Sequence, residues 1–239
     1  MATPFIDYYE HSLDMQFLQS TAYPFVREVA EFYRTYAVFN ATTQRFDLLF
    51  TCAQEICDMR QLGQAFVQHN SLIDLAFAQM ALRKAADWAG VLGVEPELAQ
   101  AWAHLADQLA PYPQTTDPKF GNRPVWSEAY NVNPTTKLWE PAPFASNYMY
   151  PIVHFAAIHP GGLVGLGSSP EQLELAFNTV WGDNERSGWH PVNGFCLAWP
   201  SATRVTNRTM APLLLDRFTA AVQATMQPNF WPRSEEKRK

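Results

Sequence analysis

Two glutamates stand in settings where a carboxyl group can act as an acid or as a base. Glu55 lies in the segment TCAQEICDMR between two cysteines, and the nearest basic residue is Arg60. A carboxyl group in apolar surroundings has a raised pKa, which a general acid needs. Glu140 lies between Trp139 and Pro141 in an aromatic segment. These settings indicate acid–base chemistry, and the alternatives are an exposed helix glutamate at 55 and a surface-loop glutamate at 140.

Further side chains could line a ligand site. His154 lies in an otherwise apolar segment, which is also where a satisfied core histidine is found. Trp189 and His190 follow a polar stretch, and a tryptophan at such a junction can stack on a sugar ring or fill a core. His154 and His159 lack the four-residue spacing of a helical zinc pair. No nucleotide-binding or redox motif stands out, so the sequence predicts neither a metal nor another cofactor.

The composition is that of a globular chain with an aromatic-rich interior. Of its 239 residues, 47% are hydrophobic and only 17% are charged, and the net charge is −6. This charge argues against nucleic acid or an anionic membrane as a partner. No apolar run approaches the ~18 residues of a membrane span. No secretion signal is visible. The sequence does not establish the compartment, and a secreted parent protein stays open.

The segment from Trp126 to Gly167 differs from the rest of the chain. Its first half is rich in proline, tryptophan and asparagine, with a turn signal at Asn133-Pro134. Its second half, from Tyr148 to His159, is apolar and aromatic. These features predict a long ordered loop that leads into a buried helix. Long ordered loops on rigid scaffolds are where binding and catalytic sites concentrate.

Outside the segment from Trp126 to Gly167, the sequence shows mainly helical periodicity and helix-capping signals. Ser71 and Ser169 are good N-cap residues, Pro24 and Pro170 suit first helical turns, and Asp14 can cap a continuation of the first helix. We expect about eight helices and almost no strand. The predicted helices cover 6–17, 24–36, 72–92, 96–109, 148–159, 170–181, 191–204 and 211–226, with a short strand at 46–50 and a polar loop at 182–190. Successive helices joined by short turns predict an all-α fold of helical hairpins.

Several of these segments resemble the catalytic domain of glycoside hydrolase family 95, the inverting α-L-fucosidases and α-L-galactosidases. The opening YYEHSLDMQFLQSTAYPFVREVAEFY resembles a helix hairpin of that family, and NSLIDLAFAQMALRKAADWAGVLG resembles the following helix, with Asp74 in place. TCAQE stands where the family has Pro-Ser-x-Ser-Pro-Glu, so the resemblance implies that Glu55 is the general acid. VHFAAIHPG resembles the family's Ser-His-Leu-x-x-Leu-x-Pro-Gly motif at His154, Pro160 and Gly161. The SGW segment resembles the next segment of the family, and Trp189 is in register with it.

The resemblance implies an (α/α)6 toroid of helical hairpins, of which residues 1–232 would form about two thirds, followed by a charged tail at 233–239. In the family an Asp and two Asn residues hold the attacking water. The segment WEPAPFASNYMYP has no Asp, and Glu140 and Asn147 are the nearest substitutes. The resemblance further implies a carbohydrate substrate, with a site lined by Trp139, Asn147, His154, Trp189 and His190. Missing domains of a parent protein would be partners, because the family adds a β-sandwich before the toroid and a segment after it.

These observations leave three hypotheses. The first is an inverting glycoside hydrolase, or a fragment of one that can be inactive alone, which removes a terminal L-fucoside or related sugar from an oligo- or polysaccharide. Glu55 would be its acid, and Glu140 or an acid outside the chain would be its base. The second is a non-catalytic helical scaffold that binds carbohydrate or protein, supported by the missing Asp. A toroid of the terpenoid-cyclase kind ranks last, because no aspartate-rich metal motif is present. An incomplete ring would expose apolar flanks on its two end helices.

Overall fold

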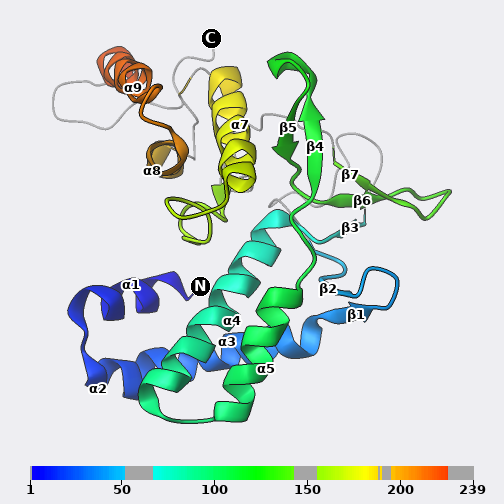
Figure 1. Cartoon of the computed structure of the whole chain (residues 1–239), viewed down its shortest axis with the longest axis vertical. Coiled ribbons are helices and arrows are strands. Elements are labelled where there is room, and N and C mark those ends of the chain that lie inside the picture. The colour runs from blue at the N-terminus through cyan, green and yellow to red at the C-terminus, as the bar shows by residue number, and fades with distance from the viewer. Residues whose placement is uncertain (1, 52–66, 143–154, 188, 190–194, 226–239) are drawn as a thin grey trace.

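The structure is a computed structural model that describes residues 2–51, 67–142, 155–187, 189 and 195–225 (Figure 1). It is mostly helical. The helices are α1 Thr3–Ser12, α2 Met15–Phe17, α3 Tyr23–Tyr36, α4 Leu72–Leu92, α5 Pro96–Gln108, α7 Pro170–Ser187, α8 Phe195–Val205 and α9 Ala211–Thr225. The strands are β1 Val38–Asn40, β2 Arg45–Asp47, β3 Gln68–His69, β4 Gln114–Asp117, β5 Arg123–Trp126, β6 Tyr130–Val132 and β7 Trp139–Pro141. None of the described helices is long and apolar enough to cross a membrane.

Local capping and chain-stop signals explain helices α4 and α5. The Ser71 hydroxyl accepts a hydrogen bond from the backbone N–H of Asp74 at 3.2 Å, and α4 starts there. Gly93 takes a left-handed conformation with φ of 67°, which ends α4. Pro96 occupies the first turn of α5, where its missing N–H costs no hydrogen bond. The predicted helices at 72–92 and 96–109 are confirmed.

The first predicted helix is divided in two. Leu13 is left-handed with φ of 53° and closes α1. The Asp14 carboxylate then accepts the backbone N–H of Phe17 at 3.0 Å and caps α2. A π-helical turn, Leu18–Ala22, joins α2 to α3. The cap at Asp14 was therefore predicted correctly, although the helix it begins is short.

Two hydrophobic cores share α4. The first core packs α1, α3, α4 and α5 together around buried Val26, Leu82 and Trp102. The second core lies between α7, α8 and the turns at 155–164, with Trp181 and Trp199 among its members. α4 contributes to both cores, and α1–α5 and α7–α9 therefore form two helical groups that meet at one end of α4 (Figure 1).

Short antiparallel strands correct the expectation of almost no strand. They form the pairs β1–β2 and β4–β5 and a three-stranded sheet in the order β3-β6-β7. Strands β6 and β7, and the last residue of β5, lie in the region that was predicted as a long loop. Asn133 explains the hairpin between β6 and β7, because its side-chain oxygen accepts the N–H groups of Thr135 and Thr136 at 2.9 and 3.0 Å. The largest described sheet has three strands, so the chain is mostly helical rather than all-α.

The polar loop predicted at 182–190 is wrong over 182–187, where α7 continues to Ser187. Asp183 and Asn184 are buried in that last part of the helix. The Asn184 amide donates to the Val180 carbonyl at 2.9 Å, which satisfies part of its hydrogen-bonding capacity within the helix. A run of polar residues predicts a loop, but two residues of this run, Asp183 and Asn184, are buried in the structure.

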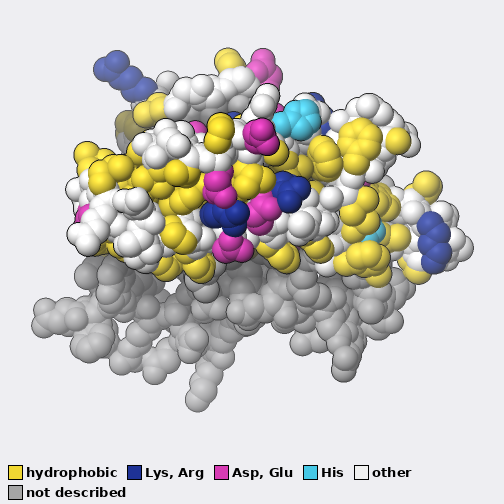
Figure 2. All heavy atoms as spheres, turned by 90° about the horizontal axis from the view of Figure 1, so that it is seen from below, with side chains coloured by type: hydrophobic (Ala, Val, Ile, Leu, Met, Phe, Trp, Pro, Cys, Tyr) yellow, Lys and Arg dark blue, Asp and Glu magenta, His cyan; other side chains and the backbone are white. Residues whose placement is uncertain are grey.

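Apolar side chains are exposed on the helices at both ends of the described chain. They include Tyr8 and Met15 near the start and Leu215 and Phe218 in α9. The space-filling view in Figure 2 shows hydrophobic side chains among charged ones over much of one face of the molecule.

Candidate functional site

The three-stranded sheet carries a partly exposed group of rings, which we call the aromatic cluster: Phe50, His69, Tyr130 and Trp139. The ring centroids of His69 and Trp139 lie 4.5 Å apart, and those of His69 and Phe50 lie 5.2 Å apart at 86°. Tyr130 and Trp139 are 6.4 Å apart. Phe50 is 74% exposed and Trp139 is 37% exposed, whereas His69 is 7% exposed. The cluster therefore offers aromatic surface to solvent above a buried imidazole, and such a surface suits stacking on a sugar ring.

Strand pairing explains which side chains meet. His69 lies opposite Tyr130, and Val132 lies opposite Trp139. Residues opposite one another share a face of the sheet, and successive residues alternate. The aromatic residues of β3, β6 and β7 therefore share one face.

A second row of residues, Gln68, Asn131 and Glu140, is paired across the same strands and lies on the opposite face. The Gln68 amide donates to the Asn131 side-chain oxygen at 3.1 Å. Glu140 is exposed on β7, an edge strand. The sequence placed Trp139 and Glu140 in one site, but strand alternation projects their side chains from opposite faces.

The hydrogen bond that His69 accepts shows which of its ring nitrogens carries the proton. The backbone N–H of Phe50 donates to His69 Nδ1 at 2.9 Å, so Nδ1 is an acceptor and the neutral ring carries its proton on Nε2. Burial lowers the pKa of His69 below its usual value, and the Gln68 backbone and Asp47 oppose this effect. His69 is therefore a neutral imidazole at neutral pH.

A buried polar network holds the sheet against the start of α4. The Asn70 amide accepts the Leu48 N–H and donates to the Asp47 carboxylate, both at 2.7 Å. The Thr51 hydroxyl accepts the Ser71 N–H at 3.0 Å. Asp47, Asn70 and Ser71 are all buried. Since each of these bonds is shielded from water, the network stabilises the base of the aromatic cluster.

Several predicted site residues, Glu55, Asn147, His154 and His190, lie outside the described residues. The described chain nevertheless shows where two of their segments are attached. Thr51 pairs with Gln68, and the Thr51 N–H donates to the Gln68 carbonyl at 3.0 Å, so the ends flanking 52–66 meet at β3. Ala142 donates its N–H to the Ala129 carbonyl at 2.8 Å, beside β6 and β7. Both ends that flank 52–66, the range of Glu55, therefore lie at this small sheet, whereas 143–154 follows Ala142 beside the sheet and precedes Phe155 in the second core.

Trp189 is in a different environment from Trp139. It is 3% exposed, and its ring lies 4.9 Å from that of Trp181 and 5.0 Å from that of Trp199. Its indole N–H donates to the Glu185 carboxylate at 2.8 Å. These contacts are those of a core residue, which was one of the two alternatives that the sequence left open.

Sequence reasoning missed His69, Phe50 and Tyr130. His69 and Tyr130 lie in strands of two and three residues, and Phe50 lies outside any strand. A run of that length is too short to show the alternation of polar and apolar residues that identifies a strand. Aromatic type was the only signal present. It does not separate these rings from the many aromatic residues of the core.

The fold and the site define the class of protein as a mostly helical domain with a small sheet that carries partly exposed aromatic rings. The model of the glycosyl hydrolase family 95 catalytic domain matches residues 1–137, and the chain belongs to this family. No curated protein matches the chain significantly. The family match includes Glu55 and His69 and ends at Lys137, before Trp139 and Glu140. Membership implies a glycosyl hydrolase domain with a carbohydrate substrate.

Proposed function

We propose that the chain is an inverting glycoside hydrolase domain that removes a terminal L-fucoside, or a related sugar, from an oligo- or polysaccharide. Its helical hairpins would form part of an (α/α)6 toroid. The family match over residues 1–137 is the observation that carries the proposal, because its range includes Glu55, to which the resemblance assigns the role of general acid. The aromatic cluster supports it, because an exposed tryptophan lies on the sheet to which the segment containing Glu55 is anchored.

In the proposed reaction, Glu55 transfers its proton to the glycosidic oxygen as the bond to the anomeric carbon breaks. A water attacks that carbon from the opposite face of the sugar and gives its proton to a carboxylate, so the configuration is inverted. In such enzymes the two carboxyl groups stand ~6.5–9.5 Å apart, which leaves room for the water. The leaving alcohol is released neutral, and one proton passes from the base to the acid over the cycle.

Glu140 is our candidate for the base, with an acid outside the chain as the alternative. Because Glu140 projects from the face opposite Trp139, a sugar stacked on Trp139 reaches Glu140 only across the edge of β7. Asn147, His154 and His190 would line the same sugar, as the family resemblance implies. Trp189 would contribute from the second core only if the sugar displaced its present ring contacts.

The second candidate function is a non-catalytic scaffold that binds carbohydrate. The observation that favours it is the absence of an Asp from the segment WEPAPFASNYMYP, where the family holds its water. The aromatic cluster would serve this function equally well. The two candidates differ in one measurable property, which is turnover.

The test is release of the chromophore from aryl α-L-fucoside and aryl α-L-galactoside by the full chain. We expect hydrolysis of one of them, with NMR showing the inverted anomer first. Glu55→Gln should lose activity by a factor of at least ~100, since general acid catalysis contributes about 100- to 10,000-fold. Glu97→Gln, at an exposed position of α5, is the control and should remain active. Retained activity in Glu55→Gln would remove Glu55 from the mechanism, and sugar binding without any turnover would favour the scaffold.

A further inference from the structure

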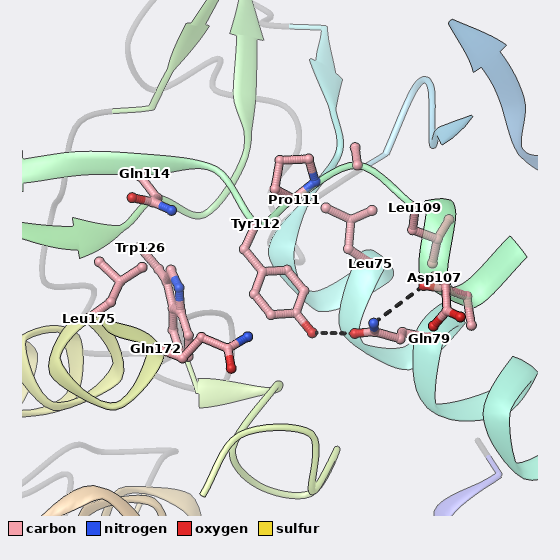
Figure 3. A pocket seen from close by; sticks show the side chains of 12 residues that line it. Leu75, Gln79, Asp107, Leu109, Pro111, Tyr112, Gln114, Trp126, Gln172 and Leu175 are labelled. Atoms are coloured by element: carbon pink, nitrogen blue, oxygen red, sulfur yellow. Dashed lines mark hydrogen bonds between the residues drawn. The ribbon is translucent and has the colours of Figure 1, made fainter. Parts of the chain in front are cut away.

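A second candidate ligand site lies between the end of α5 and the start of α7, beside α4. It is a pocket of about 200 Å³ (Figure 3). A neighbouring hollow of about 300 Å³ shares Gln114, Gln172 and Leu175 with it. Together they form a groove along α7, which we call the α5–α7 groove. None of the residues that line it belongs to the aromatic cluster or to the sheet that carries that cluster.

One polar group in the pocket is held in a single orientation. The Tyr112 hydroxyl donates to the Gln79 side-chain oxygen at 3.0 Å, and the Gln79 amide nitrogen donates to the Ala106 carbonyl at 3.3 Å. These two bonds decide which end of the Gln79 amide is the oxygen. The amide nitrogen keeps a second N–H, and the Tyr112 oxygen keeps acceptor capacity. A ligand hydroxyl can therefore bind both as an acceptor and as a donor at this point.

Two further amides border the pocket on its open side. Gln114 and Gln172 are both exposed, and Figure 3 shows the Gln172 side chain on the same side of the pocket as the Tyr112 hydroxyl. Each amide offers a carbonyl oxygen and two N–H donors. A side-chain amide is the natural partner for a hydroxyl group that both donates and accepts.

The floor of the pocket is apolar. Leu75, Leu109 and Leu175 line it, and Tyr112 and Trp126 pack edge to face at 5.6 Å. Trp126 itself is buried, so it closes the floor rather than offering a free ring face. A ring with C–H groups on one side and hydroxyl groups on its edge would match a floor and a rim of this kind.

The charges of the lining do not favour an anion. Among the described residues that line the groove there is no lysine or arginine. The acid of the pocket, Asp107, is paired with Arg83 at 2.9 Å. The neighbouring hollow adds Glu171 and Glu174. The carboxylates of Glu171 and Glu174 disfavour a phosphate, a sulfate or a uronic acid at the hollow, whereas a neutral hydroxyl-rich ligand meets no such repulsion.

We propose that the α5–α7 groove is a second saccharide-binding site, which holds a neutral sugar unit separately from the sugar at the aromatic cluster. The choice of a sugar over another neutral polar ligand rests on the proposed function of the domain. The site itself rests on the fixed Gln79 amide, the two rim amides, the apolar floor and the absence of basic side chains from its described lining. It would hold a chain of the polysaccharide while a terminal unit occupies the catalytic site.

The experiment uses the full chain labelled with ¹⁵N and carrying Glu55→Gln, so that substrate is not consumed. The side-chain amide signals of Gln79, Gln114 and Gln172 are assigned from single Gln→Ala variants. Methyl α-L-fucoside and a neutral fucosylated trisaccharide are then titrated separately. We expect saturable shifts of the Gln79 and Gln172 signals. Gln172→Ala should weaken that binding about tenfold, the scale of one or two neutral hydrogen bonds, whereas Gln100→Ala, at an exposed position of α5 outside the groove, should not change it.

The outcomes separate this inference from the proposed function. Shifts that persist in Trp139→Ala support a distinct site, and shifts that vanish in that variant overturn it. If the wild-type chain hydrolyses the aryl glycoside but none of the three amide signals shifts, the saccharide site in the groove is overturned and the proposed function is not. Shifts without hydrolysis leave the groove standing and count against the proposed catalysis. Equal shifts from glycerol or from inorganic sulfate would overturn the assignment to a neutral sugar.

Discussion

The imidazole of His69 lies against the indole of Trp139, with ring centroids 4.5 Å apart and the planes inclined at 53°. The two residues come from β3 and β7, which do not pair with each other, since β6 lies between them. His69 is fixed by the hydrogen bond from the Phe50 backbone and by burial. It therefore acts as a rigid support that presents the indole to solvent, and this contact is where we expect a sugar to stack.

Replacing Trp139 should weaken substrate binding more than it slows the chemical step. Trp139→Ala should raise KM about tenfold, because a stacked ring is worth ~0.5–1.5 kcal/mol beyond the area it buries. Trp139→Phe keeps a ring and should restore most of the affinity. Steady-state kinetics on the active aryl glycoside measures both variants. An unchanged KM in Trp139→Ala would place the sugar elsewhere.

Glu140→Gln tests the assignment of the base. The side chain is exposed on an edge strand, so the substitution should leave the unfolding temperature unchanged. If Glu140 takes the proton of the attacking water, kcat should fall by ~100- to 10,000-fold with little change in KM. Added azide gives a sharper readout, because a small anionic nucleophile needs no base and can restore sugar release in such a variant. A fully active Glu140→Gln enzyme would assign the base to another acid.

The contribution of Asp183 to the stability of the protein should fall as the pH rises toward neutrality. It is 1% exposed, and burial raises the pKa of its carboxyl group to about 7. The folded protein then holds a proton that the unfolded chain releases near its ordinary pKa of 3.8. The contribution of Asp183 to stability is therefore largest below pH 3.8, falls as the pH rises from about 4 to about 7, and levels off above that.

Asp183→Asn removes this ionisation and isolates the effect. At ~1.4 kcal/mol for each unit of pKa shift, the variant should exceed the wild type in unfolding free energy by a few kcal/mol above pH 7. The difference should shrink as the pH falls to about 4. Urea unfolding at pH 4.5, 6 and 8 measures it. A difference that is the same at all three values would mean that Asp183 does not titrate in this range.

Gly161 should tolerate no side chain. A Cβ at this position would lie against the backbone carbonyl of Ala156, far closer than real Cβ contacts come, and close to the Cα of Ala157 at 3.5 Å. The Gly161 N–H also donates to that same carbonyl at 2.9 Å, so the backbone has little freedom to move away. Gly161→Ala should cost ~1–3 kcal/mol, the range of overpacked core sites.

Gly165→Ala is the matched control, because a Cβ there would meet no atom within 4 Å. It should change the unfolding free energy by less than ~0.5 kcal/mol, as surface substitutions usually do. Thermal unfolding of the two variants side by side gives the comparison. Similar melting temperatures for both would show that the turn at 155–164 relaxes around the added methyl group.

The sequence by itself determined several helix starts and stops and the family. Capping at Asp14 and Ser71 and the glycine stop at Gly93 depend on atoms a few residues apart, so they could be recognised before the chain was folded. The resemblance that pointed to Glu55 is confirmed as family membership, while the role of Glu55 itself stays a prediction. Local chemistry and short-range spacing were sufficient for these conclusions.

Only the tertiary structure decided which residues share a site. His69 meets Trp139 because β6 separates and aligns their strands, and Glu140 faces away from Trp139 because side chains alternate along a strand. Asp183 is buried because the second core closes over α7, although its neighbours in sequence are polar. Each of these facts depends on contacts between distant segments, and the free energy of such contacts is set by packing rather than by the local sequence.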